Sequence, residues 1–156
     1  MAWSTVTFGR NKGKTLPQII FADPDWFFWA VEENIFENKG PLRNEASNLD
    51  RRARAIRIPN NPHHRLLAEY VFYPPYGTFS ELHIVRADTP LHEGASPTTR
   101  MRVIDLSVPR SVKGYDKLGY ELIIRDVKRI LFGDATFRMT RQRCEQFFDN
   151  VGNFEL

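Results

Sequence analysis

The sequence has 156 residues, of which 42% are hydrophobic and 13% aromatic, and this composition excludes an intrinsically disordered chain. Its formal net charge of +3 is compatible with a nucleic-acid partner but is not diagnostic of one. The single cysteine, Cys144, excludes an internal disulfide and a zinc site built from several cysteines.

The length suits one domain, and we expect residues 1–156 to form a single domain with a core of its own. No stretch approaches the roughly 20 apolar residues that a membrane helix needs. The N-terminal segment MAWSTVTF has neither the cationic start nor the long apolar core of a signal peptide. We therefore expect a cytoplasmic protein without a membrane partner.

A cationic loop follows the first apolar residues of the chain. Residues 9–14 read GRNKGK, and the glycines at the two ends allow the backbone to turn where a Cβ would clash. The cations on this turn are Arg10, Lys12 and Lys14. Mobile cations together with backbone amides around Gly9 and Gly13 are typical of an anion-binding site.

Two helix starts come directly after the loop. Thr15 and Gln18 have the spacing of a capping box, and Asp23-Pro24 places an N-cap residue before a proline at the first helical position. The second helix is expected over residues 24–37 and is expected to end at Gly40-Pro41. Its aromatic side chains are assigned to the core in preference to a base-stacking surface; they are Trp26, Phe27, Phe28 and Trp29.

This stretch resembles a known small module. The matching residues are Phe8-Gly9-Arg10-x-Lys12-Gly13-Lys14-x-Leu16-x-x-Ile19 and Asp23-Pro24-x-Trp26-Phe27-x-Trp29. The module occurs at the C-terminus of exodeoxyribonuclease X-like proteins and in short bacterial and phage proteins, one group of which is named for quorum-sensing-regulated virulence. The resemblance covers residues 5–36. Because the acidic motifs of the exonuclease domain are missing, the resemblance implies an accessory or binding role and not nuclease activity.

The next segment combines a helix with a cluster of arginines. Residues 42–53 are expected to form a helix and residues 55–59 a short strand. The cluster consists of Arg51, Arg52, Arg54 and Arg57. It is either a solvated face or a second phosphate-contact patch beside the loop.

Three strands are expected in the middle of the chain, over residues 66–74, 79–87 and 100–108, with the first two paired as a hairpin. Alternation places Phe79, Glu81, His83 and Val85 on one face of the second strand. Tyr73, Tyr76 and Phe79 flank a proline-rich turn and are candidates for exposed aromatic side chains.

Two further helices complete the chain. The first is expected over residues 115–132 with Leu118 in its apolar stripe, and the second begins after Thr140 with Val151 facing inward. The order of elements predicts an α+β fold, in which an antiparallel sheet of three to five strands carries helices mainly on one face.

Catalytic chemistry has little support in the sequence. The loop lacks the spacing of a nucleotide-binding P-loop by one residue, and no G-x-S-x-G nucleophile motif is present. Glu81 and His83 are the only potential metal ligands that periodicity places together. The other candidates are His63, His64, His92, Glu69, Asp88 and Asp105. We therefore assign no catalytic residue, no metal site and no cofactor.

The sequence favours a non-catalytic protein that binds nucleic acid, DNA in preference to RNA, through the phosphate backbone. The expected contacts are Arg10, Lys12, Gly13, Lys14, Arg51, Arg52, Arg54 and Arg57. Such a protein would act as an accessory factor in DNA or RNA processing. The first alternative is a phage or mobile-element protein that binds and modulates a host nucleic-acid complex. The second is a metal-dependent nuclease.

Overall fold

The computed structural model describes residues 2–59, 63–73, 77–91, 98–134, 136 and 138–156. The chain forms two compact units, which are described separately here. Unit 1 comprises Met1–Ile56, Asp105–Ser107 and Arg138–Leu156, and unit 2 comprises Arg57–Ile104 and Val108–Phe137. Helices and antiparallel strands are both present, which confirms the predicted α+β class.

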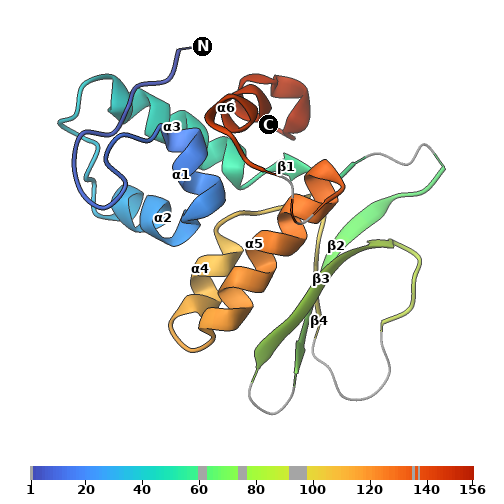
Figure 1. Ribbon diagram of the computed structural model, residues 1–156. Coiled ribbons are helices and arrows are strands. Elements are labelled where there is room, and N and C mark those ends of the chain that lie inside the picture. Colours follow the sequence, from blue (N-terminus) through green and yellow to red (C-terminus); the bar gives the residue numbers. More distant parts are fainter. Residues whose placement is uncertain (1, 60–62, 74–76, 92–97, 135, 137) are drawn as a thin grey trace. The chain divides into compact units, whose positions relative to one another are not determined.

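Unit 1 is helical, and its first helix packs against three others (Figure 1). Its elements are α1 (Leu16–Ala22), α2 (Pro24–Glu32), α3 (Pro41–Ala53), α6 (Arg141–Asp149) and the 3-10 helix η1 (Val151–Asn153). Short α1 contacts α2, α3 and α6 because almost every side chain along it is apolar. Leu16, Ile19 and Ile20 are completely buried, so α1 forms the centre of this unit.

Aromatic rings fill the rest of the core of unit 1. Phe27 and Phe28 on α2 are buried, which confirms the prediction that they belong to the core. Phe148 on α6 stacks on Phe154 with ring centroids 5.5 Å apart and packs against Phe21 on α1 at 5.4 Å. Such ring pairs add about 0.5–1.5 kcal/mol beyond the burial of their area. They hold the C-terminal segment against α1.

The predicted end of the second helix is wrong. α2 ends at Glu32, and Asn34 adopts a left-handed conformation with φ +54°. Pro41 occupies the first position of α3 and Gly40 is its N-cap residue, so these two residues begin a helix where we expected them to end one. Proline suits the first helical position for two reasons: its fixed φ matches that of a helix, and this residue needs no N–H donor.

The last helix begins as predicted, since the Thr140 hydroxyl accepts a hydrogen bond from the Arg143 amide at 3.3 Å. Cys144 and Phe148 are buried on its inner face. Val151 is 62% exposed and not buried as expected. The chain leaves α6 at Asn150 and enters η1, so the helical periodicity no longer applies to Val151.

Unit 2 contains a three-stranded antiparallel sheet with strand order β3-β2-β4. Its strands are β2 (Leu66–Tyr73), β3 (Thr78–Arg86) and β4 (Thr98–Met101), and its helices are α4 (Val108–Lys113) and α5 (Lys117–Phe132). Two shorter strands, β1 (Ile56–Arg57) and β5 (Val103–Ile104), form a separate two-stranded sheet. α5 packs against β3 and α4 packs against α5, so both helices lie on one side of the three-stranded sheet (Figure 1).

The third predicted strand, residues 100–108, is divided in the structure. β4 ends at Met101, β5 covers only Val103–Ile104, and α4 begins at Val108. Pro109 therefore lies in the first turn of a helix, where proline is tolerated, and does not close a strand.

A β-bulge removes Phe79 from the predicted face of β3, while Glu81 and His83 share a face as expected. Val71 pairs with Glu81 while Phe72 pairs with Phe79, so Ser80 is an extra residue in β3. Phe79 and Leu82 are consequently both buried, at 5% and 0% exposure, although strict alternation assigns them to opposite faces. Phe79 is therefore a core residue and not the exposed aromatic that we expected. Tyr76, the central aromatic candidate of this turn, lies outside the described residues.

Polar side chains of α5 bond to the backbone of β3. The Asp126 carboxylate accepts from the Leu82 amide at 3.0 Å, and the Arg129 guanidinium donates to the Leu82 carbonyl at 3.0 Å. At the start of the helix, the Asp116 carboxylate accepts from the amides of Phe79 at 2.7 Å and Gly119 at 2.8 Å. The N-cap residue of α5 thus also fixes the first turn of the helix to the strand.

The inward stripe of α5 differs from the predicted one. Gly119, Tyr120, Ile123 and Val127 are buried, whereas Leu118 is 66% exposed. The close approach to β3 needs a residue without a side chain, and only Gly119 provides it in this turn. That requirement rotates Leu118 away from the sheet. Among the described residues, no helix is long and apolar enough to cross a membrane.

Candidate nucleic-acid interface

The cationic loop is a closed hairpin in unit 1. The Val6 amide donates to the Lys14 carbonyl at 2.8 Å, and the Gly13 amide donates to the Val6 carbonyl at 2.7 Å. Gly9 and Gly13 have φ values of +70° and +90°, which confirms that the turn depends on glycine at both positions. The hairpin therefore presents its cations from a fixed backbone.

The hairpin uses several of its own amides. Besides the Gly13 amide, the Lys12 amide donates to Gly9 at 3.2 Å and the Lys14 amide donates to Asn11 at 3.2 Å. These three N–H groups point at carbonyl oxygens within the loop. An anion at this hairpin would therefore be held by side chains, and the expected contribution of the Gly13 amide has no geometric support.

The positive charge of Arg10 is paired with Asp23, which the sequence analysis identified as a helix N-cap. Its guanidinium lies 2.8 Å from the Asp23 carboxylate through Nη2 and donates to it through Nε at 3.0 Å. The buried Asn11 amide also contacts this carboxylate, at 3.4 Å. Asp23 occupies the N-cap position of α2, yet its side chain makes no capping hydrogen bond. It holds the hairpin against the helix instead.

Lys12 and Lys14 are exposed, as is Arg10, but only Arg10 pairs with a carboxylate among the described residues. Within the described part of the chain, neither ammonium group forms an ion pair. Unlike Arg10, both therefore keep their full charge toward solvent. They are the strongest candidates for phosphate contact in unit 1.

A hollow lies next to the hairpin. It has a volume of about 320 Å³ and is lined by Arg10, Asp25, Trp26 and Trp29. Trp26 is buried as expected, but Trp29 is 41% exposed, so its assignment to the core is wrong. One signal could have indicated this: four successive aromatic residues cannot all lie on the buried side of a helix with 3.6 residues per turn.

Two members of the arginine cluster make contacts that support the fold of unit 1. Arg52 donates to the Phe148 carbonyl and lies over the Phe154 ring at 5.7 Å, so it supports the core of unit 1. Arg54 pairs with Asp50 at 3.0 Å and lies over the Phe28 ring at 4.8 Å. The two remaining members, Arg51 and Arg57, are exposed, and Arg57 belongs to unit 2.

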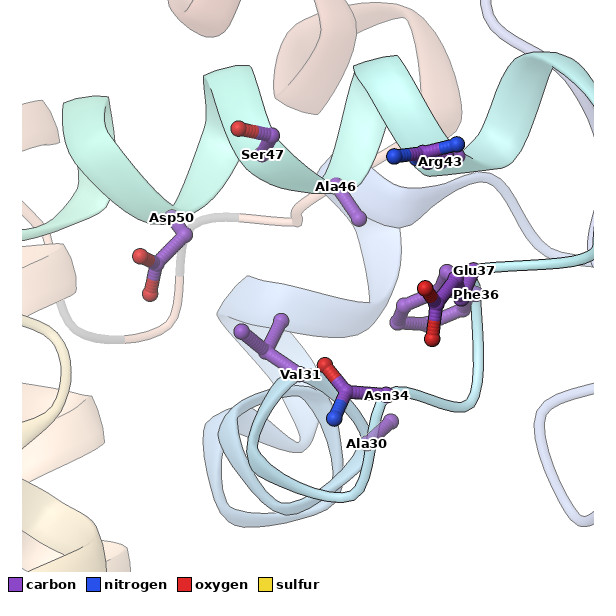
Figure 2. A pocket seen from close by; sticks show the side chains of 9 residues that line it. All are labelled: Ala30, Val31, Asn34, Phe36, Glu37, Arg43, Ala46, Ser47 and Asp50. Carbon is purple, nitrogen blue, oxygen red and sulfur yellow. The ribbon is translucent and has the colours of Figure 1, made fainter.

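A second hollow of unit 1 lies between α3 and the segment at the end of α2, with a volume of about 240 Å³ (Figure 2). Its charged lining residues are Arg43, Glu37 and Asp50. Two carboxylates against one guanidinium would repel a phosphate backbone. This hollow therefore does not extend the cationic surface of the hairpin.

Three of the candidate metal ligands contact one another in unit 2. His83 contacts Glu69 through Nε2 at 2.6 Å and Glu81 through Nδ1 at 3.2 Å, so both ring nitrogens face carboxylates. Arg100 Nε donates to the other oxygen of Glu69 at 2.6 Å. Among the described residues, no group of three or more His, Cys, Asp or Glu side chains could hold a metal ion. His92 lies outside this part of the chain.

The same cluster sets the charge of Glu69. Burial alone would raise the pKa of this carboxyl group, but hydrogen bonds from His83 and Arg100 outweigh it and lower the pKa below the ordinary value of 4.5. Glu69 is only 5% exposed and pairs with Arg100 across neighbouring strands. It is a structural carboxylate of the sheet.

The lowered pKa predicts how the stability of unit 2 depends on pH. A carboxyl group with a lower pKa in the folded chain than in the unfolded chain stabilises the fold above the unfolded value and loses this effect as the pH falls through the folded value. We expect the urea midpoint to fall as the pH drops below the ordinary pKa of 4.5, and Glu69→Gln to reduce this fall. Equal pH dependence in both proteins would contradict the assignment.

Comparison with known proteins found no matching family model, no matching curated protein and no matching solved structure. The function is therefore argued from the geometry of the hairpin and its neighbouring hollow.

Proposed function

We propose that this is a non-catalytic nucleic-acid-binding protein that contacts the phosphate backbone through Lys12 and Lys14. The observation that carries the proposal is the contrast within one hairpin: Asp23 neutralises Arg10, whereas the two lysines are exposed and unpaired among the described residues. The hydrogen bonds that close the hairpin fix the backbone from which both lysine side chains extend. Charge-assisted contacts to phosphate are the chemistry for which such a turn is suited.

The proposed role is that of an accessory factor in DNA or RNA processing in the cytoplasm. The resemblance of residues 5–36 to the module of exodeoxyribonuclease X-like proteins supports it, because that module lies outside the catalytic domain. The mutual pairing of His83, Glu69 and Glu81 also favours binding over metal-dependent cleavage. Of the eight residues expected to contact nucleic acid, Arg52 and Arg54 support the fold, and Lys12 and Lys14 are the main proposed contacts.

The test is fluorescence anisotropy with labelled DNA and RNA at several salt concentrations. The Lys12→Ala/Lys14→Ala variant removes two phosphate contacts, so the slope of log K against log salt should decrease in magnitude by about 1.4 for a single strand and about 1.8 for a duplex. Affinity at low salt should fall roughly 10- to 100-fold, independently of the base sequence.

The matched control is Lys117→Ala/Lys128→Ala, which removes the same net charge from α5 in unit 2. We expect it to keep most of the affinity. Equal losses in both variants would mean that only the net charge matters, and this would refute the role of the hairpin. No binding by the unaltered protein even at low salt would refute the proposed function and would favour a protein partner instead.

A further inference from the structure

We infer that Trp29 is a stacking platform for an unpaired nucleobase, so that the ligand of the hairpin is a single strand of nucleic acid. This inference rests on the proposed function, because the phosphates of the same strand would contact Lys12 and Lys14. It adds the class of nucleic acid, which the lysines alone do not determine.

Trp29 is the exposed aromatic residue of α2. Its neighbours Phe28 and Ala30 are 1% and 0% exposed, whereas Trp29 is 41% exposed. Trp26 packs beside it, with ring centroids 6.5 Å apart and ring planes tilted by 48°, and is itself only 7% exposed. The exposed indole is therefore supported by a buried one, which limits the freedom of the platform before a ligand arrives.

The hairpin lies against the aromatic residues of α2. Phe8, directly before the turn, packs against Trp26 with ring centroids 6.3 Å apart, so the hairpin contacts the indole that lies next to Trp29. Arg10 lines the same hollow as Trp29, and its ion pair with Asp23 fixes this wall. A strand whose phosphates contact the hairpin would thus bring its bases to the hollow.

The charges in the hollow favour a base over a phosphate as its occupant. Asp25 contributes a carboxylate to the lining, and Arg10 is already paired with Asp23, so the hollow itself offers little net positive charge. A phosphate is favoured at the uncompensated lysines outside the hollow. A neutral, flat base has no such preference and gains from the exposed indole, because every base has an aromatic face.

A closed duplex cannot use this platform. Its bases are stacked on one another, and exposing one face requires unstacking and unpairing, which costs a few kcal/mol. An unpaired base is already accessible. Stacking on Trp29 should therefore discriminate single strands from duplexes of the same length.

The experiment compares oligo-dT, oligo-U and a blunt duplex of equal length by fluorescence anisotropy. Trp29→Ala should weaken binding of the single strands roughly 5- to 100-fold and leave duplex binding within about two-fold. The salt slope should not change, because no phosphate contact is removed. Trp29→Phe should retain much of the single-strand affinity, since it keeps an aromatic face, and it guards against a fold defect in the alanine variant.

Two further measurements make the test specific. Tyr73 is 57% exposed and belongs to unit 2, so Tyr73→Ala removes an exposed aromatic ring that is not part of the hollow and should leave all affinities unchanged. Trp3 and Trp26 are only 4% and 7% exposed, so quenching of tryptophan fluorescence by acrylamide reports mainly on Trp29. Oligo-dT should protect this fluorescence from quenching, and the duplex should not.

The possible failures can be distinguished. Loss of affinity on Lys12→Ala/Lys14→Ala without any effect of Trp29→Ala would leave the proposed function intact and overturn the stacking platform. The platform would also be overturned if Trp29→Ala weakened duplexes and single strands equally, or if the duplex protected Trp29 from acrylamide. Absence of all binding by the unaltered protein would overturn the proposed function itself.

Discussion

Replacing Gly119 with alanine should destabilise unit 2 by about 2–3 kcal/mol, because α5 approaches β3 most closely at this residue. An added Cβ would collide with the Asp116 carboxylate and would lie 2.9 Å from the Phe79 Cβ. The carboxylate cannot move aside cheaply, since it accepts hydrogen bonds from the amides of Phe79 and Gly119. Relief of the clash would break the helix cap or separate the helix from the sheet.

The change can be measured as a shift of the urea or thermal unfolding midpoint. Gly114→Ala is the matched control, because nothing lies within 4 Å of an added Cβ at that position. It should be neutral or slightly stabilising, since alanine restricts the unfolded chain. If Gly119→Ala unfolded at the same midpoint as Gly114→Ala, the close packing of α5 on β3 would be wrong.

Replacing Glu69 with alanine should cost about 3–5 kcal/mol. Its side chain is only 7% exposed and that of Arg100 is 15% exposed, so the change would leave the guanidinium buried without its carboxylate. Among the described residues, Arg100 would keep its bonds to the carbonyls of Thr89 and Pro90, at 2.7 and 3.2 Å. The loss of a buried charge partner costs far more than the loss of a surface ion pair.

Glu81→Ala is the matched control for this change, since Glu81 contacts His83 as well but its side chain is 57% exposed. It should cost less than about 1 kcal/mol. Chemical denaturation at neutral pH measures both variants. Similar losses in the two proteins would show that the pairing with His83 matters and that the buried pair with Arg100 does not.

Local signals in the sequence predicted much of the fold. The hydrogen bond from the Thr15 amide to Gln18 Oε1, at 3.0 Å, is one half of the predicted capping box, and α1 begins where that box places it. The hairpin of β2 and β3 and the start of α6 at Thr140 also follow from nearest-neighbour chemistry. These features depend on residues only a few positions apart.

Features that depend on tertiary packing were not predictable in the same way. The bulge at Ser80 places Phe79 and Leu82 together in the core. No pattern of neighbouring residues predicts this bulge. Leu118 has the spacing of an inward residue, but the requirement for Gly119 at the helix–sheet contact turns it outward. Periodicity shows that a helix is amphipathic, but the strand against which it packs determines which side chains face inward.

The candidate site shows the same division. Glycine chemistry was sufficient to predict a turn with Lys12 and Lys14 on its surface. The compensation of Arg10 was not visible, because it depends on Asp23, whose position before Pro24 indicated a helix cap. The exposure of Trp29 was missed because an aromatic-rich helix was assigned to the core as a whole.

The bonds from α5 to the backbone of β3 also bear on the outer edge of the three-stranded sheet. β3 is an outer strand of its sheet, and such a strand can recruit a strand from another molecule through its unused backbone groups. Asp126 and Arg129 engage the amide and carbonyl of Leu82, where an incoming strand would dock. These two bonds leave fewer unused backbone groups on β3 for pairing with a strand of another molecule.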